Sequence, residues 1–172
     1  MAVQGSLGAL RSRANSRRIK CLTVADDFSH ECVDIATDYG IGGQYVTRLL
    51  DRAALFRGYP DVVRTDNGPE FTSRAFMGWA QTHGIRHILI QPGRPMQNGY
   101  IGSFNGKFRD ECLNDHWFET LPQARAMIAA WRQDCNEVRP YSSYRRMPPA
   151  KFAALRRQNS ADATQPTTNE IL

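Results

Sequence analysis

RTDNGPEFTS, residues 64–73, is the stretch that decides the fold. Two valines precede it and predict the end of a short buried strand, so Asp66 stands just past the strand's C-terminal end. An Asn-Gly pair then predicts a turn, and the Pro-Glu pair after it suits the first turn of a helix. Carboxylates at the C-terminal ends of strands face the crevice in which α/β folds bind their ligands. The stretch therefore predicts an α/β protein with Asp66 in its functional site.

Three further motifs follow in order, and with TDNGPEF they carry a family resemblance. They are QPGRPMQN (residues 91–98), YIGSFNGKFRDECLN (residues 100–114) and WRQDCNEVRPYSS (residues 131–143). The series resembles the catalytic core of IS3-type insertion-sequence transposases and, more distantly, retroviral integrases. This resemblance covers residues 17–154. It implies a ribonuclease H-like mixed sheet flanked by helices.

The resemblance also implies a catalytic set of three carboxylates, of which this chain keeps one. The family orders them Asp, Asp, Glu, with thirty-five residues between the last two. Asp66 matches the second, and Gly102 occupies the position of the Glu. The first Asp belongs to a WxxDF-like strand, but residues 1–25 contain no acidic residue. We therefore expect the first strand to be degraded or missing, and two of three metal ligands to be absent.

The implied reaction is phosphoryl transfer on DNA, in which two metal ions stabilise the attacking and leaving oxygens. The family uses Mg²⁺ or Mn²⁺, and Asp66 alone cannot fix a pair of ions, so we expect weak or absent metal binding. The resemblance places the following residues beside DNA: Arg64, Asn67, Arg94, Gln97, Asn98, Asn105, Lys107 and Arg109.

Neighbouring acids do not replace the missing ligands. Asp26 and Asp27 are interpreted as an Asx-type turn at the tip of a hairpin. Asp110 and Glu111 lie about 12–13 Å beyond position 102 along a helix axis, at a rise of about 1.5 Å per residue. Glu70 belongs to the ordinary TDNGPEF motif of the family.

Size and charge fit one DNA-binding domain. The chain has 172 residues, a net charge of +5 and arginine clusters near both ends, which favours attraction to a polyanion such as DNA. Four cysteines show no zinc-site or CxxC spacing, so we expect buried thiols in a reducing cytoplasm. No apolar run approaches the length of a membrane span.

The predicted organisation has three parts: an irregular basic leader (residues 1–16), a core domain (residues 17–155) and a polar disordered tail (residues 156–172). Periodicity predicts four strands and four long helices in the core. The strands are expected at residues 19–25, 31–37, 61–65 and 85–90, and the helices at 41–56, 70–82, 97–114 and 121–138. The 91–96 segment resembles the family's flap beside the active site.

We predict a degenerate, truncated transposase core that binds DNA and lacks cleavage and strand transfer. One alternative is an inhibitory module that binds DNA ends or intact transposase subunits. Another is an active strand-transfer enzyme that uses non-standard ligands. The expected partners are DNA and either a second copy or an intact relative, with no membrane, and the expected location is the bacterial cytoplasm beside the nucleoid.

Overall fold

The computed structural model describes residues 2–8, 13–14, 17–90, 99–140 and 147–162. Its centre is a five-stranded sheet of order β5-β4-β1-β6-β7. β4 is antiparallel to β1 and β5, whereas β1, β6 and β7 run parallel. The strands are β1 (Ala2–Gly8), β4 (Lys20–Asp26), β5 (Cys32–Asp38), β6 (Val62–Thr65) and β7 (Arg86–Leu89), with a separate ribbon of β2 (Arg13–Ala14) and β3 (Arg17–Arg18). The predicted mixed sheet is therefore confirmed.

β1 corrects the prediction for the start of the chain. Residues 1–16 were expected to be an irregular leader, yet Ala2–Gly8 forms the central strand, hydrogen-bonded to β4 on one side and β6 on the other. The small residue Gly5 allows the Phe71 ring to pack on the strand, since a Cβ there would lie 3.4 Å from Phe71 Cζ. Pairing on both edges outweighs the weak strand propensity of glycine and serine.

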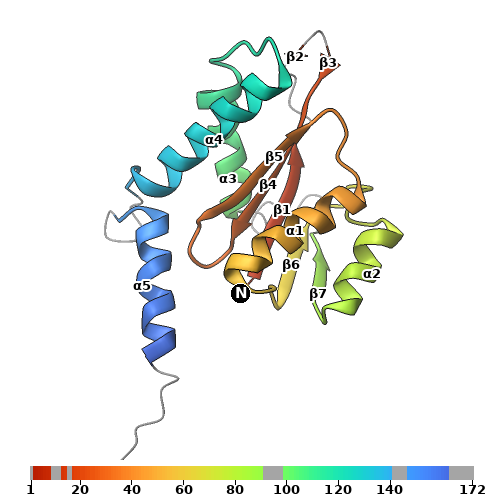
Figure 1. Ribbon diagram of the computed structural model, residues 1–172, viewed down its shortest axis with the longest axis vertical. Helices are drawn as coiled ribbons and strands as arrows, with labels where there is room; N and C mark the ends of the chain where they lie inside the picture. Colours follow the sequence, from red (N-terminus) through yellow and green to blue (C-terminus); the bar gives the residue numbers. More distant parts are fainter. Residues whose placement is uncertain (1, 9–12, 15–16, 91–98, 141–146, 163–172) are drawn as a thin grey trace, which may run out of the picture.

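Helices cover both faces of this sheet (Figure 1). They are α1 (Gly43–Arg57), α2 (Arg74–Thr82), α3 (Gly99–Phe108), a π-helical turn (Arg109–Leu113), α4 (Leu121–Glu137) and α5 (Pro149–Asp162). α1 and α2 enclose one apolar cluster, which includes Leu22, Val63 and Phe76. α3 and α4 enclose a second, which includes Phe104 and Trp131. The sheet therefore separates two cores.

The helix boundaries differ from the predicted ones where capping decides them. α2 was expected to begin at residue 70, but Ser73 is its N-cap and accepts a hydrogen bond from the Phe76 amide at 3.2 Å. Gly42 is the N-cap of α1, with an extended backbone at φ −118° and ψ 177°. The helix expected over residues 97–114 changes to the π-helical turn at Arg109.

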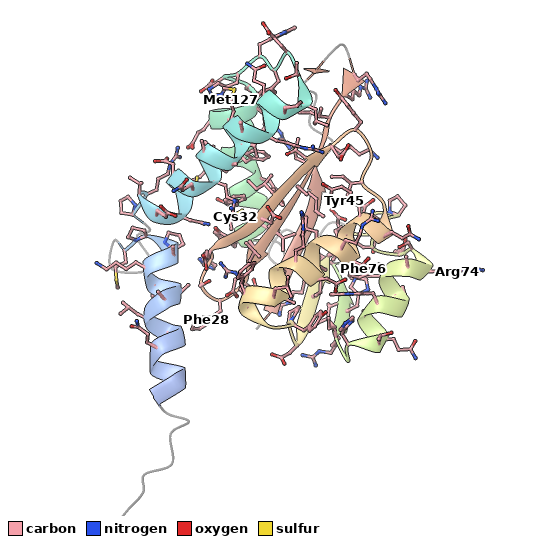
Figure 2. All side chains as sticks on the ribbon, in the orientation of Figure 1. Phe28, Cys32, Tyr45, Arg74, Phe76 and Met127 are labelled. Atoms are coloured by element: carbon pink, nitrogen blue, oxygen red, sulfur yellow. The ribbon has the colours of Figure 1, made fainter. Side chains whose placement is uncertain are left out.

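The edge strand β5 is covered by side chains from α4. Asn136 accepts a hydrogen bond from the Cys32 amide and donates one to the Cys32 carbonyl, both at 2.9 Å. Arg132 donates to the Val33 carbonyl at 2.8 Å, and Arg125 donates to the Thr37 carbonyl at 2.9 Å. Figure 2 shows Cys32 on the side of β5 that faces α4. α4 thus satisfies backbone groups that an open sheet edge would expose.

α5 corrects the prediction of a disordered tail beginning at residue 156. The helix continues to Asp162 and extends beyond the sheet (Figure 1). Its first turns are anchored, because Ala153 is buried and the Phe152 ring lies 6.0 Å from that of Phe28. Once anchored, a helix gains one hydrogen bond for each further residue. Residues 163–172 lie outside the described part of the chain.

The four cysteines, Cys21, Cys32, Cys112 and Cys135, are buried free thiols, as predicted. Burial raises the pKa of Cys21 to about 11, so its reactive thiolate is suppressed. Among the described helices, none combines the length and apolar character needed to cross a bilayer.

We predict that Asn136→Ala will destabilise the fold. The substitution leaves the buried Cys32 amide without its α4 partner and the Cys32 carbonyl with only the longer bond from Arg132 at 3.4 Å, at a cost of about 1–3 kcal/mol. Urea unfolding is the measurement, and Gln133→Ala, an exposed position on the same helix, is the control. Equal stability of the two variants would contradict this account of the β5 edge.

Candidate active site

Asp66 directly follows β6 and closes the turn that the sequence predicted. Its Oδ1 accepts a hydrogen bond from the Gly68 amide at 3.1 Å. The Gly68 carbonyl in turn accepts from the Phe71 and Thr72 amides at 3.0 and 3.2 Å. The turn therefore fixes the Asp66 carboxylate at the C-terminal end of a parallel strand, the place that α/β folds use for ligands.

Glu70 is the acid that the structure brings closest to this turn. A Cβ built on Gly68 would lie 1.9 Å from Glu70 Oε1 and 3.1 Å from Asp66 Oδ1, so both carboxylates border the same small space. Burial raises the pKa of Glu70, and the negative charge of Asp66 raises it further. The two carboxylates therefore lie close enough for their charges to repel one another.

β1 runs beside β6, the strand that leads to Asp66, and holds no acid. β1 and β6 are in parallel register from Ala2 beside Val62 to Gly5 beside Thr65. The next residue on β1, Ser6, pairs on its other side with Thr23 of β4. The first strand is present, but without the carboxylate that the family resemblance implies there.

The position of the third carboxylate lies on the exposed side of α3. Gly102 is exposed, and a Cβ added there would meet no atom within 4 Å. Three residues further on, Asn105 Oδ1 accepts a hydrogen bond from Thr23 Oγ1 at 2.8 Å, which ties α3 to β4. Space for a glutamate side chain at position 102 is therefore available, although the side chain is not.

The other acids considered from the sequence are engaged elsewhere. Asp26 Oδ1 and Oδ2 accept from the Phe28 amide and the Ser29 hydroxyl at 3.1 and 3.0 Å, which confirms the Asx-type turn. Glu111 forms an ion pair with Arg139. From residue 71 to residue 109 the sequence contains no Asp or Glu at all.

The predicted DNA-binding residues are only partly brought together. Asn67, Lys107 and Arg109 are exposed, whereas Asn105 is half-buried in its bond with Thr23. Arg64 forms an ion pair with Asp27 at 2.6 Å, so part of its charge is already compensated. Three predicted residues lie outside the described part of the chain: Arg94, Gln97 and Asn98.

These residues do not fit a site for two metal ions. Such a site needs carboxylate oxygens from three elements, because the two ions share ligands. In the described residues no group of three or more His, Cys, Asp or Glu side chains could hold an ion. What the geometry supplies is one turn-anchored aspartate, one buried glutamate and exposed cations on α3 and on the π-helical turn that follows it.

Comparison with protein families identifies the class. Residues 4–95 match one integrase core domain family and residues 83–149 match a second family of the same description. The first match covers more than half of the chain and begins inside β1, well before the residue at which the resemblance was expected to start. The chain belongs to the integrase core domain family.

The relatives are insertion-element proteins, as the motifs predicted. The chain is 67% identical over 153 residues to the IS476 uncharacterized 39.2 kDa protein of Xanthomonas euvesicatoria, covering 89% of this chain and 44% of that protein. It is 64% identical over 150 residues to the IS407 uncharacterized 31.7 kDa protein of Burkholderia multivorans, covering 87% of this chain and 54% of that protein. The chain thus spans about half the length of these relatives and is an integrase core of the insertion-sequence type.

Solved structures support the fold. The catalytic core of HTLV-2 integrase in complex with magnesium superposes with a TM-score of 0.68 at 18% identity, covering 88% of this chain and 94% of that one. A chain in the structure of the simian T-cell lymphotropic virus intasome in complex with PP2A regulatory subunit B56 gamma gives a TM-score of 0.73 at 17% identity, covering 99% of this chain and 56% of that one. The ribonuclease H-like prediction is therefore confirmed at the level of the fold.

We predict that Gly102→Ala will stabilise the protein. The added methyl group enters open space, and alanine favours the helix by about 0.5–1 kcal/mol. Urea unfolding measures the change. Gly43→Ala is the contrasting variant, since its Cβ would lie 1.8 Å from Ser73 Oγ and 2.8 Å from Ser73 Cβ; it should destabilise. A destabilised Gly102→Ala protein would show that position 102 is less open than the structure indicates.

Proposed function

We propose that this chain is a DNA-binding integrase core of a bacterial insertion element that does not cleave or join DNA. The observation that carries the proposal is the carboxylate set. Asp66 remains, while Ser6 and Gly102 stand where the other two ligands belong. The missing groups are metal ligands and not parts of the scaffold. Folding and DNA binding are therefore retained, whereas DNA cleavage and joining are lost.

DNA is the proposed partner on grounds of charge. The chain carries a net charge of +5, and Lys107 and Arg109 are exposed on the helical segment that also holds position 102. Self-association is proposed as well, because solved cores of the same fold are described in dimeric and trimeric forms. Since the curated relatives are bacterial, a location beside the bacterial chromosome belongs to the same proposal.

We predict no Asp66-dependent nicking of labelled insertion-element ends with Mg²⁺ or Mn²⁺. The protein and its Asp66→Asn variant should give the same background, because one carboxylate cannot position two ions. Nicking that disappears in Asp66→Asn would contradict the proposal and favour an active enzyme with non-standard ligands.

A variant in which both missing carboxylates are put back tests whether their absence accounts for the lack of nicking. Ser6→Asp combined with Gly102→Glu should bind Mn²⁺ at least about tenfold more tightly than the unmodified chain, since affinity follows the number of charged ligands. Leu7→Asp combined with Gly102→Glu is the matched control, because it adds the same charge one register position away from Ser6. Equal Mn²⁺ affinity of the restored variant and its control would show that β1 and α3 are not the missing ligand positions.

We predict that DNA affinity will fall with salt and that Lys107→Ala with Arg109→Ala will reduce the slope. Each lost phosphate contact lowers the slope of log K against log salt by about 0.9. Fluorescence anisotropy with duplexes of unrelated sequence is the measurement. Arg48→Ala with Arg52→Ala removes the same charge from α1, on the other face of the sheet, and should change the slope less. A larger effect of the α1 pair would place the DNA on that face instead.

A further inference from the structure

The first turn of α3 is attached to the tip of the β4–β5 hairpin by one tyrosine. The Tyr100 ring stacks on the His30 ring with centroids 4.1 Å apart and an interplanar angle of 8°. The Tyr100 hydroxyl also donates a hydrogen bond to the His30 carbonyl at 2.5 Å. A single side chain therefore contacts both the ring and the backbone of His30.

The hairpin tip is built to hold His30 in this orientation. His30 has a φ of +54°, the left-handed region that few side-chain-bearing residues adopt. Its amide donates to the Asp26 carbonyl at 2.9 Å, while the Asp26 carboxylate accepts from Phe28 and Ser29. Hydrogen bonds within the hairpin tip therefore fix its shape, and Tyr100 packs on a surface that is already ordered.

A second polar tie holds the same helix one and a half turns later. Thr23 Oγ1, on a residue only 2% exposed, donates to Asn105 Oδ1 at 2.8 Å. Position 102 lies between the two ties, two residues after Tyr100 and three before Asn105. At about 1.5 Å per residue these separations are about 3 and 4.5 Å along the axis.

α3 is held by apolar contacts as well as by these two ties. Ile101, Phe104 and Phe108 are buried, but hydrophobic packing is not directional and tolerates small shifts. Hydrogen bonds and ring stacking at two points do define where the helix lies along the sheet.

We propose that Tyr100 is a positioning residue: held on His30, it fixes the first turn of α3 and sets where the side chain at position 102 lies relative to Asp66. In this chain the clamp remains although the residue that it positions is a glycine. This inference rests on the proposed function only in treating position 102 as a ligand position. Its test requires neither metal nor DNA.

The experiment places a nitroxide on Gly102→Cys and measures the paramagnetic broadening of the amide signals of residues 66–68. The four native thiols are buried, so labelling is directed to the exposed position 102. Hydrogen exchange at residues 101–104 is measured in the same proteins without the label. Tyr100→Leu removes the stack and the hydrogen bond, whereas Tyr100→Phe removes only the hydrogen bond.

The expected result is weaker broadening at Asp66 and about tenfold faster exchange in Tyr100→Leu, with a smaller change in the same direction in Tyr100→Phe. Tyr59→Leu is the matched control, because Tyr59 also stacks on a histidine, His83, at 4.1 Å but on the opposite face of the sheet. It should leave both readouts unchanged.

Broadening and exchange that are unchanged in Tyr100→Leu would overturn the proposal and assign the placement of α3 to its apolar contacts. If Tyr100→Leu unfolds, the decision rests on Tyr100→Phe, which keeps the ring. Unchanged broadening and exchange in Tyr100→Phe overturn the role of the hydrogen bond. Weaker broadening and faster exchange support it. Cleavage and DNA-binding results leave this outcome untouched, so the two proposals fail independently.

Discussion

The structure depends on the backbone pairing of β1 with strands on both of its sides. Ala2–Gly8 hydrogen-bonds antiparallel to β4 and parallel to β6. Without it, β5 and β4 would be separated from β6 and β7, and the inner edges of β4 and β6 would lose their partners. Each unsatisfied buried backbone group costs about 1–3 kcal/mol, so a central strand of poor intrinsic propensity is still strongly favoured. Both apolar cores form on the surface that this pairing completes.

The same requirement explains how the outer edge of the sheet is treated. On its outer side β5 has no neighbouring strand among the described residues, and α4 supplies side chains in place of one. The amide of Asn136 reproduces the donor and acceptor of a strand residue. Arg125 and Arg132 donate hydrogen bonds to further carbonyl groups of β5. Unlike an added strand, these side chains create no new sheet edge. The helix therefore acts as packing for the second core and as a partner for the edge backbone.

Loss of catalytic carboxylates and retention of the scaffold are physically compatible. Carboxylates gathered for metal binding repel one another when no ion is present, so removing two of them relieves a cost in the folded state. Position 102 is open to solvent, and no packing there depends on a side chain. The polar ties from Tyr100 and Asn105 lie outside the ligand positions, which leaves the geometry of α3 intact. Under the proposed assignment, catalytic ligands and the residues that position them are separable parts of this fold.

Motif order and hydrophobic periodicity determined the family, the mixed sheet, most helices and the place of Asp66, because these follow from local chemistry. The absence of acids before residue 26 and between residues 71 and 109 is also a fact of the sequence alone. Only tertiary structure decided that Ala2–Gly8 is the central strand, that α5 reaches Asp162 and that β1 runs beside the strand leading to Asp66. The stack of Tyr100 on His30 is likewise invisible in the sequence, as seventy residues separate the two. Long-range strand pairing and side-chain ties of this kind arise from chain topology, for which local composition carries no signal.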